Sequence, residues 1–364
     1  FYGDVPIVLN SYELNEQLKM KSSKADVVEQ ALKDIDFAIA NLEDKPYSDG
    51  RVNMGAAQAI KVRILMANNN WADAASLSKS IWKDGQFSLS PEFNSLFTAG
   101  EQAGNPEIIF SVKYLKPNKE HIGSLNWGWW MSVSPLQNLI DEFEMTDGMS
   151  IATSPLYDPD NPYLNRDPRM VMTADVPGSD NDPGSVFGFP DENGGEDIMW
   201  KDRVNSLPSP LRYNLRKYAD RTFQASVDAS NHCDTDYVIL RLGEVILNYA
   251  EAQNEAAGPD ATVYEAVNAI RGRVGMPDLP AGLSQDDMRT AIRHERRVEL
   301  AFEGMRWLDL KRWGTLVERI NSVDATQVPV AYTHSDNNVL WPIPQSEIDF
   351  YTANDLDLGQ NPGY

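Results

Sequence analysis

The chain has too few cysteines for a disulfide framework and too few cations for a nucleic-acid surface. Cys233 is its only cysteine, so no internal disulfide can form. Its 32 Lys and Arg residues stand against 54 Asp and Glu residues, a formal charge of −22. Proteins that bind nucleic acids neutralise phosphates with clustered Lys and Arg. The acidic excess therefore argues against a nucleic-acid partner, and repulsion argues equally against an anionic membrane surface.

Long apolar runs are also missing, because no uncharged stretch approaches the ~20 residues of a membrane-spanning helix. The chain opens FYGDVPIV, without an initiator Met or the pattern of a signal peptide. We therefore expect a mature form or a segment of a longer protein. A hydrophobic fraction of 42% over 364 residues is an ordinary globular value and argues against a mostly disordered chain.

Catalytic signatures are scarce. The sequence holds no Gly-rich phosphate loop, no G-x-S-x-G elbow and no H-E-x-x-H zinc helix. Four histidines leave little for a multi-His metal site, and we expect no cofactor. The turn from Asp180 to Gly184 could offer oxygens to calcium, but it lacks the full loop pattern and a terminal Glu.

Helical periodicity marks two parts of the chain, residues 22–86 and 238–322. Apolar residues recur there at steps of three and four, which is typical of one buried helix face. Residues 52–85 are predicted to form two helices, with a break at Asn68–Asn70. The whole unit has about the length of a tetratricopeptide hairpin. A second hairpin of similar size is broken at Gly258. The pattern predicts a mainly α protein with a tetratricopeptide-like scaffold of helical hairpins.

The stretch between these parts has a different texture. Residues 87–237 are rich in Pro, Gly, Asn and Asp, and we predict a long irregular, loop-rich insertion there. Residues 323–364 are predicted to be a C-terminal extended segment. We expect scaffold, insertion and extension to form one domain over residues 1–364.

A further helix is predicted after Ser284, with Gly304 past its end. Its apolar stripe consists of Met288, Ile292, Val298 and Phe302. Glu295 falls inside that stripe, and a buried carboxylate has to be paired. The candidate partners are Arg241, Arg306 and Arg312. Glu295 is then either a catalytic acid or a structural ion pair, and we favour ion pairs that involve Glu295, Arg306 and Arg312.

Tryptophan is the most informative of the abundant residues. Three of the nine tryptophans, Trp127, Trp129 and Trp130, lie within five residues of one another. On an extended backbone, Trp127 and Trp129 would project to one side and Trp130 to the other. Exposed indole faces suit the C–H groups of a sugar ring. The alternative is that the rings anchor the core. The carbohydrate-binding candidates are Asn126, Trp127, Trp129, Trp130 and Trp200.

Several segments resemble one known family. Residues 295–304 (ERRVELAFEG) and 306–314 (RWLDLKRWG) look like the C-terminal hallmark of the SusD/RagB family. Other segments that match it are residues 241–252, 268–271, 2–6, 161–169, 342–345 and 360–364. The resemblance covers essentially the whole chain, in order.

The resemblance implies a SusD-like fold, a tetratricopeptide-like scaffold with a less regular insertion. It also implies a lipoprotein at the cell surface, on the outer membrane of Bacteroidetes-type bacteria. Such proteins cap a SusC-like TonB-dependent transporter and bind glycans for import without catalysis. Membrane contact would come only through an N-terminal lipid that this sequence does not contain, since Cys233 is internal. We expect part of the scaffold to be missing before Phe1. Sugar-binding residues of the family lie in variable loops, so the candidates above rest on the tryptophan argument.

The expected function is non-catalytic binding of an oligosaccharide or polysaccharide and its delivery to a TonB-dependent transporter. The leading alternative is a transporter-associated lid that binds a peptide or another non-sugar nutrient. A glycoside hydrolase comes third. An exposed tryptophan platform favours sugar, a charged cleft with buried rings favours the lid, and two facing carboxylates would indicate hydrolysis.

The tryptophan cluster yields a direct prediction. Trp129→Ala or Trp130→Ala should abolish the retardation of the protein by polysaccharide in affinity gels, because each removes a stacking surface. Circular dichroism should show that both variants stay folded. Unchanged retardation of both variants would reject this site.

Overall fold

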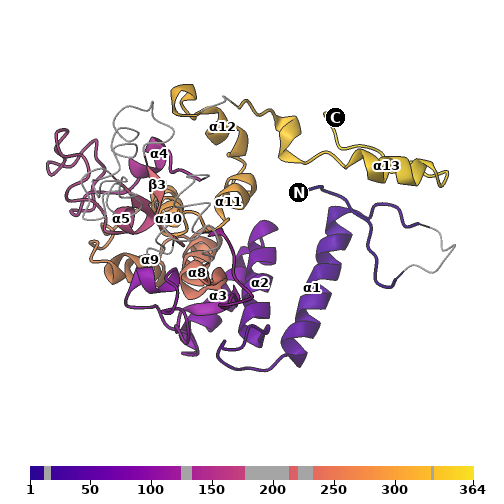
Figure 1. The fold of residues 1–364 in the computed structure, drawn as a ribbon, viewed down its shortest axis with the longest axis horizontal. Coiled ribbons are helices and arrows are strands. Elements are labelled where there is room, and N and C mark those ends of the chain that lie inside the picture. Colours follow the sequence, from indigo (N-terminus) through magenta and orange to yellow (C-terminus); the bar gives the residue numbers. More distant parts are fainter. Residues whose placement is uncertain (12–17, 124–132, 177–212, 220–232, 329–331) are drawn as a thin grey trace. The chain divides into compact units, whose positions relative to one another are not determined.

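The structure is a computed structural model that describes residues 1–364 except 12–17, 124–132, 177–212, 220–232 and 329–331 (Figure 1). The chain divides into two compact units. The larger unit comprises Leu42–Arg306 and Asp324–Val330. The smaller unit comprises Phe1–Asn41, Trp307–Val323 and Ala331–Tyr364. No helix in the described ranges is long and apolar enough to cross a membrane.

The larger unit is mainly helical. In chain order its elements are α2 (Met54–Ala67), α3 (Trp71–Lys83), η1 (Phe93–Leu96), β1 (Ile108–Val112), α4 (Gln137–Ile140), α5 (Arg169–Thr173), β2 (Ala174–Asp175), β3 (Asn214–Leu215), β4 (Tyr237–Arg241), α8 (Leu242–Ala257), α9 (Ala261–Arg273), α10 (Gln285–Glu299) and η4 (Ala325–Gln327).

Local chemistry sets where these helices begin. Asn53, Asp260 and Ser284 precede α2, α9 and α10, and each side-chain oxygen accepts from a backbone amide two or three residues on, at 2.8 to 3.1 Å. Such caps satisfy amides that the first helical turn leaves without a partner. The helices α2 and α3 form the first predicted hairpin, and α8 and α9 form the second.

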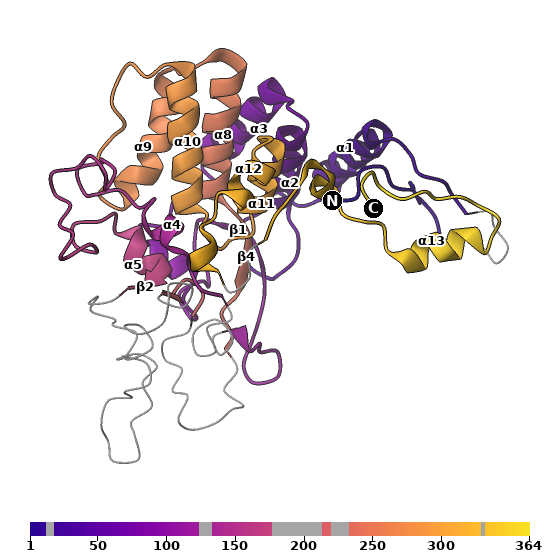
Figure 2. The same cartoon turned by 90° about the horizontal axis from the view of Figure 1, so that it is seen from above.

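Helix α8 is the centre of the larger unit. It packs against α3, α9 and α10, and Figure 2 shows α8, α9 and α10 running side by side. Buried residues occur on all its faces, which is typical of a helix surrounded by others. Its buried polar side chains find partners on neighbouring helices. Glu244 pairs with Arg63 of α2, and Asn248 accepts from Arg296 of α10 at 2.7 Å.

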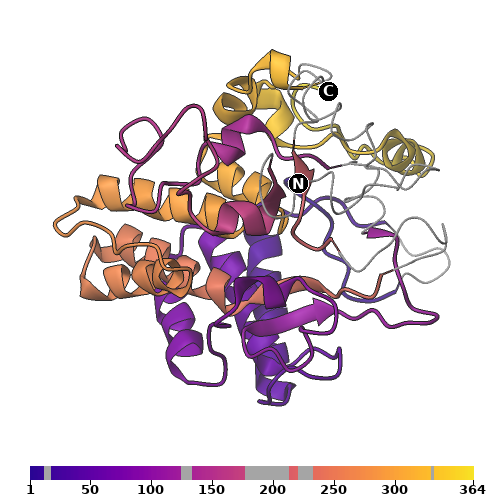
Figure 3. The ribbon, with the colours of Figure 1, turned by 60° about the vertical axis from the view of Figure 1, so that its left-hand side comes forward.

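A short antiparallel pair of strands lies beside the helices (Figure 3). β1 and β4 pair from Ile108 opposite Arg241 to Val112 opposite Tyr237. β4 leads directly into α8, because Arg241 ends the strand and Leu242 begins the helix. The apolar residues of β1 show no helical periodicity in the sequence, which is typical of a strand. The second pair, β2 with β3, joins Ala174 to Leu215.

Helix α10 ends earlier than the sequence predicts. Phe302 was expected on its apolar stripe, but the helix stops at Glu299, and Phe302 adopts a positive φ of 62°. The ammonium group of Lys217 binds the carbonyl oxygens of Glu299 and Ala301 at 3.1 and 3.0 Å. A side chain from far along the chain therefore binds at the point where the helix ends.

The smaller unit brings both chain ends together. Its elements are α1 (Lys24–Asn41), α11 (Arg306–Arg312), α12 (Leu316–Asn321), η5 (Asp336–Val339) and α13 (Gln345–Thr352). Its core is built on Ile343, Tyr351 and Leu358. Asn361 donates to the carbonyls of Tyr2 and Trp341 at 2.9 and 2.7 Å, which ties the first residues to the last.

Residues 323–364 were predicted to be an extended segment. The segment is not extended throughout, because it contains α13. Pro344 precedes this helix, where a missing amide costs nothing. The side chains of Gln345 and Asp349 then hydrogen-bond one turn apart, at 2.8 Å. The remaining division into scaffold and insertion stays a prediction.

The pair of Arg63 and Glu244 gives a test of how the two hairpins are joined. Arg63 binds both oxygens of Glu244, at 2.7 and 2.6 Å, and the Glu244 side chain is only 4% exposed. Burial raises the pKa of Glu244, but Arg63 and then Arg296 outweigh this and hold the pKa below its usual value. The stabilisation is therefore present above the unfolded pKa and is lost as the pH falls through the folded pKa.

We predict that Glu244→Gln lowers the free energy of unfolding by about 3 kcal/mol at neutral pH, as expected for a broken buried pair. The difference from the unchanged protein should shrink in acid, as the pH falls through the lowered pKa of Glu244 and the carboxylate gains a proton. Urea unfolding at neutral pH and at successively lower pH values measures this. The control is Glu265→Gln, which breaks the exposed pair with Lys83 and should cost under about 1 kcal/mol. Equal losses for both variants would contradict the assignment.

Candidate ligand-binding site

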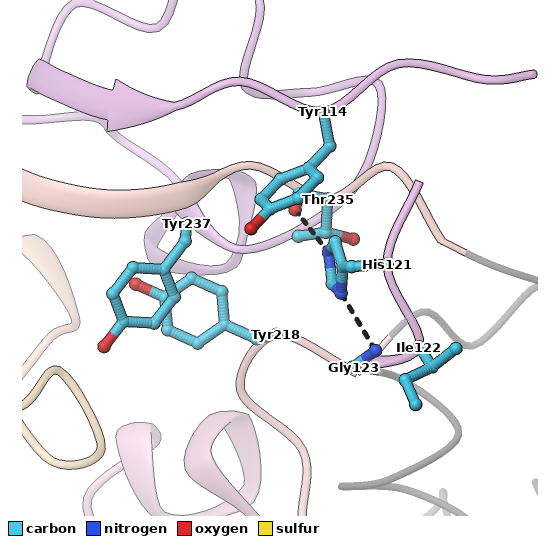
Figure 4. A pocket seen from close by; sticks show the side chains of 7 residues that line it. All are labelled: Tyr114, His121, Ile122, Gly123, Tyr218, Thr235 and Tyr237. Carbon is cyan, nitrogen blue, oxygen red and sulfur yellow. Dashed lines mark hydrogen bonds between the residues drawn. The ribbon is translucent and has the colours of Figure 1, made fainter. Parts of the chain in front are cut away.

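A cavity of about 280 Å³ opens in the larger unit, where the segment after β1 meets the segment before β4. Its size is near the lower end of small-ligand sites. The residues that line it are Tyr114, His121, Ile122, Gly123, Tyr218, Thr235 and Tyr237. We call this cavity the tyrosine pocket (Figure 4). Three aromatic rings with polar tips around one cavity suit a ligand that has both apolar faces and hydroxyl groups.

Tyr218 and Tyr237 form one side of the pocket. Their rings stack with centroids 5.1 Å apart and an angle of 24° between planes, and Figure 4 shows them side by side. Tyr218 is buried and adopts a φ of 66°, which is unusual for a bulky residue. Such strain persists only where the surroundings over-determine it. The buried ion pairs described below supply that constraint.

His121 lies on the opposite side of the pocket. Its ring lies edge-on to Tyr114, with centroids 4.3 Å apart. Nε2 donates to the Thr235 carbonyl at 2.9 Å, and Nδ1 accepts from the Gly123 amide at 2.9 Å. Backbone bonds between His121 and Cys233, at 3.0 and 2.9 Å, join their two segments. The imidazole therefore fixes the backbone on both sides of the pocket.

Two opposing influences act on this imidazole. Burial lowers the pKa of His121, whereas hydrogen bonds to the Cys233 thiol and the Thr235 carbonyl raise it, and the net shift is upward. The bond from the Gly123 amide acts against protonation, because a protonated Nδ1 cannot accept it. The arrangement seen here corresponds to the neutral ring that carries its hydrogen on Nε2.

Unpartnered polar atoms surround the cavity. Thr235 is 2% exposed, yet its Oγ1 has no hydrogen-bond partner among the described residues. The hydroxyls of Tyr114 and Tyr237 likewise make no hydrogen bond within the described part of the chain. A buried hydroxyl without a partner is rare and calls for an explanation. A ligand hydroxyl in the pocket would supply the missing partner.

A buried network of ion pairs supports the wall that carries Tyr218 and Tyr237. Lys217 precedes Tyr218, and its ammonium group binds Glu303 at 2.8 Å in addition to two carbonyls. Arg241 ends β4 and binds Glu303 at 2.6 Å and Glu299 at 2.7 Å. The segments of Tyr218 and of Tyr237 are therefore attached to the same carboxylate, that of Glu303.

Glu299 is the hub of this network. It is fully buried and accepts from Arg169, Arg241 and Arg273 at 2.9, 2.7 and 2.5 Å. Burial raises the pKa of Glu299, but Arg273, Arg241 and Arg169 outweigh it and hold the pKa well below its usual value. For Lys217, burial prevails and lowers the pKa to about 8. The network is thus charged at neutral pH although its side chains are almost completely buried.

Glu295 belongs to the same network, which confirms that it is buried and paired. The expected partners were wrong. Within the described residues its carboxylate binds Arg169 at 2.5 Å and Arg271 at 3.1 Å, and not Arg241, Arg306 or Arg312. Arg241 pairs with other carboxylates instead. The reason is geometric, since Glu295 lies one turn before Glu299 on α10 and faces α9 and α5.

In the smaller unit, Arg312 pairs with Asp309 at 3.0 Å, one turn away on α11. Its guanidinium group lies 5.1 Å from the ring centre of Trp313. Arg312 therefore takes part in a structural ion pair as expected, but with a neighbour in sequence.

The carbohydrate-binding candidates Asn126, Trp127, Trp129, Trp130 and Trp200 lie outside the described residues, as does the turn from Asp180 to Gly184. Their assignment stays a prediction. The structure instead assembles the tyrosine pocket, whose residues sequence reasoning missed. They are single tyrosines and a histidine spread over more than a hundred positions, and no spacing links them. In sequence, Gly123 of the pocket comes just before the stretch that carries Trp127 to Trp130.

Among the described residues, no group of three or more His, Cys, Asp or Glu side chains could hold a metal ion. The described lining of the pocket also contains no Asp or Glu. What the pocket offers is aromatic faces, hydroxyls and backbone groups.

Comparison with known proteins decides the family. A model described as the SusD family matches residues 102–364. The chain belongs to the SusD family. A SusD-like protein of Formosa agariphila is 25% identical over 381 residues, and the match covers 100% of this chain and 70% of that protein.

Solved structures agree with this family. A SusD-like protein from Bacteroides fragilis NCTC 9343 is 28% identical with a TM-score of 0.78, and the match covers 100% of this chain and 76% of that one. A SusD-like carbohydrate-binding protein from the same strain is 25% identical with a TM-score of 0.80, and the match covers 96% and 75%. The predicted SusD-like helical fold is therefore confirmed. This chain spans about three quarters of the length of these two relatives.

Proposed function

We propose that this protein binds an oligosaccharide or polysaccharide at the tyrosine pocket, without catalysis, as part of nutrient capture at the cell surface. Membership of the SusD family supports a glycan as the ligand. One solved relative at 25% identity is named as a carbohydrate-binding protein. The observation that carries the proposal here is the combination of three tyrosine rings with the unpartnered Thr235 hydroxyl around one cavity.

The chemistry of these groups fits a sugar better than a purely apolar ligand. A sugar ring presents C–H faces that pack on aromatic rings and hydroxyls that hydrogen-bond at its edge. Tyr114 and Tyr237 each offer a ring and a hydroxyl, and Thr235 offers a buried hydroxyl. A buried polar group that is satisfied only by the right ligand gives specificity, because a ligand without the matching hydroxyl leaves it unpaired.

The wider role is proposed from the family. The glycan would pass from this protein to a SusC-like TonB-dependent transporter, and a lipid on the full-length protein would hold it at the outer face of the outer membrane. Binding would be reversible, since capture followed by delivery requires release. The predicted tryptophan cluster would extend the binding surface, as it follows Gly123 in the sequence.

The pocket is tested by changing Tyr237, the less buried of the two stacked rings. We expect Tyr237→Ala to weaken polysaccharide binding at least tenfold, about 1.4 kcal/mol, through loss of a stacking face and a hydroxyl. Tyr237→Phe keeps the ring and should lose less. Affinity gel electrophoresis against plant, host and microbial polysaccharides identifies the ligand, and calorimetry then gives the affinities.

The matched control is Tyr332→Ala, which removes a tyrosine that is 68% exposed and does not line the pocket. It should bind as the unchanged protein does. Urea unfolding of each variant shows whether a loss reflects misfolding. Normal binding by a folded Tyr237→Ala variant would reject the tyrosine pocket as the glycan site.

A further inference from the structure

We infer that the tyrosine pocket selects an uncharged glycan and disfavours glycans that carry carboxylate or sulfate groups. This inference rests on the proposed function, because it names the class of glycan that the same site would take. The inference comes from the charges in and around the pocket.

The described lining contains no Arg or Lys side chain. It consists of three tyrosines, a threonine, an isoleucine, a glycine and His121. The His121 ring uses Nε2 on the Thr235 carbonyl and Nδ1 on the Gly123 amide, so neither nitrogen is left to bind an anion. Recognition of carboxylate or sulfate normally uses Arg or Lys, often in a bidentate arrangement.

Three of the four lysines closest in sequence to the pocket residues are paired with carboxylates. Lys113 binds Asp236 at 2.5 Å, and Lys116 lies 3.5 Å from Asp234. Lys217 is completely buried and uses its ammonium group on Glu303 and two carbonyls. Lys119 is exposed, but it does not line the pocket. Apart from Lys119, each of these lysines would have to leave a carboxylate that already binds it before it could bind an anionic ligand.

The carboxylate of Glu303 also acts on the two stacked tyrosines, Tyr218 and Tyr237. Burial raises the pKa values of Tyr218 and Tyr237, and the carboxylate of Glu303 raises both further. Arg241 lowers the pKa of Tyr218 and Arg63 lowers that of Tyr237, each by less than Glu303 raises it. A charge that opposes the ionisation of a phenol also opposes an anion placed beside that phenol. The net charge of −22 adds a long-range repulsion that slows the approach of polyanions. Neutral hydroxyl groups meet no such penalty.

The experiment compares a neutral polysaccharide with its own charged derivative. Laminarin, dextran and highly methyl-esterified pectin are screened beside sulfated laminarin, dextran sulfate and de-esterified pectin, together with any polysaccharide that retards the protein in the earlier gels. The best neutral binder is also partially sulfated. At about 50 mM salt we expect the charged form to bind at least tenfold more weakly. The ratio should shrink at about 0.5 M salt, because screening shortens the range of repulsion.

The outcomes separate the two proposals. If a charged form binds as tightly as its neutral parent, and Tyr237→Ala weakens both, the pocket binds glycans and only the preference for uncharged ones is wrong. The same holds if an anionic polysaccharide is the sole binder. If no polysaccharide in the whole set is retarded, the glycan-binding function fails and the preference fails with it.

A gain of binding gives the sharpest control. Ile122 lines the pocket and is 41% exposed, so a longer polar side chain fits there without disturbing the core. Ile122→Lys adds a cation at the pocket edge and should raise affinity for the sulfated derivative at least threefold. Ile122→Gln adds a polar side chain without charge and should not. Equal affinities of the two variants for the sulfated derivative would count against the inference.

Discussion

The carboxylate of Glu299 lies among three arginine side chains in the interior of the larger unit, and the arrangement of the surrounding segments depends on it. Arg169, Arg241 and Arg273 come from three separate elements, α5, β4 and α9. Bringing four charges out of water is costly, and their attraction offsets that cost only when the geometry is closely matched. The network therefore favours one arrangement of these elements over its alternatives more than it adds net stability.

The same ion pairs connect the helical frame to the candidate site. Arg241 ends the strand that begins with Tyr237, and Lys217 comes directly before Tyr218. Both cations bind Glu303. The strained backbone of Tyr218 is thus held by charges behind it, which leaves the phenol rings to form the pocket wall. A rigid wall suits a binding protein, because less side-chain freedom is lost when the ligand binds.

Helices were predictable from the sequence where the signal was local. The hairpins of α2 with α3 and of α8 with α9 followed from apolar periodicity and from breaks at Asn68–Asn70 and Gly258. The burial of Glu295 was predictable from its place on an apolar stripe, but its partners were not, since Arg169 is 126 residues away in the chain. The early end of α10 could not be predicted either, since the lysine that binds the carbonyls of Glu299 and Ala301 lies 82 and 84 residues away from them in the chain.

The tyrosine pocket could not be predicted, because its residues come from three separated segments and none is part of a motif. The tryptophan candidates were proposed from composition and chemistry, and they lie outside the described residues. Family resemblance identified the fold correctly from segments that are mostly structural. It could not identify the ligand, because the groups that face the cavity are not part of those segments.

Hydrogen–deuterium exchange of the chain, with and without the polysaccharide that binds it, tests the central claim most directly. If the glycan occupies the tyrosine pocket, exchange should slow in residues 114–123 and 235–241 when the polysaccharide is added. Saturating polysaccharide that leaves exchange in both segments unchanged, while protecting amides elsewhere, would contradict the account.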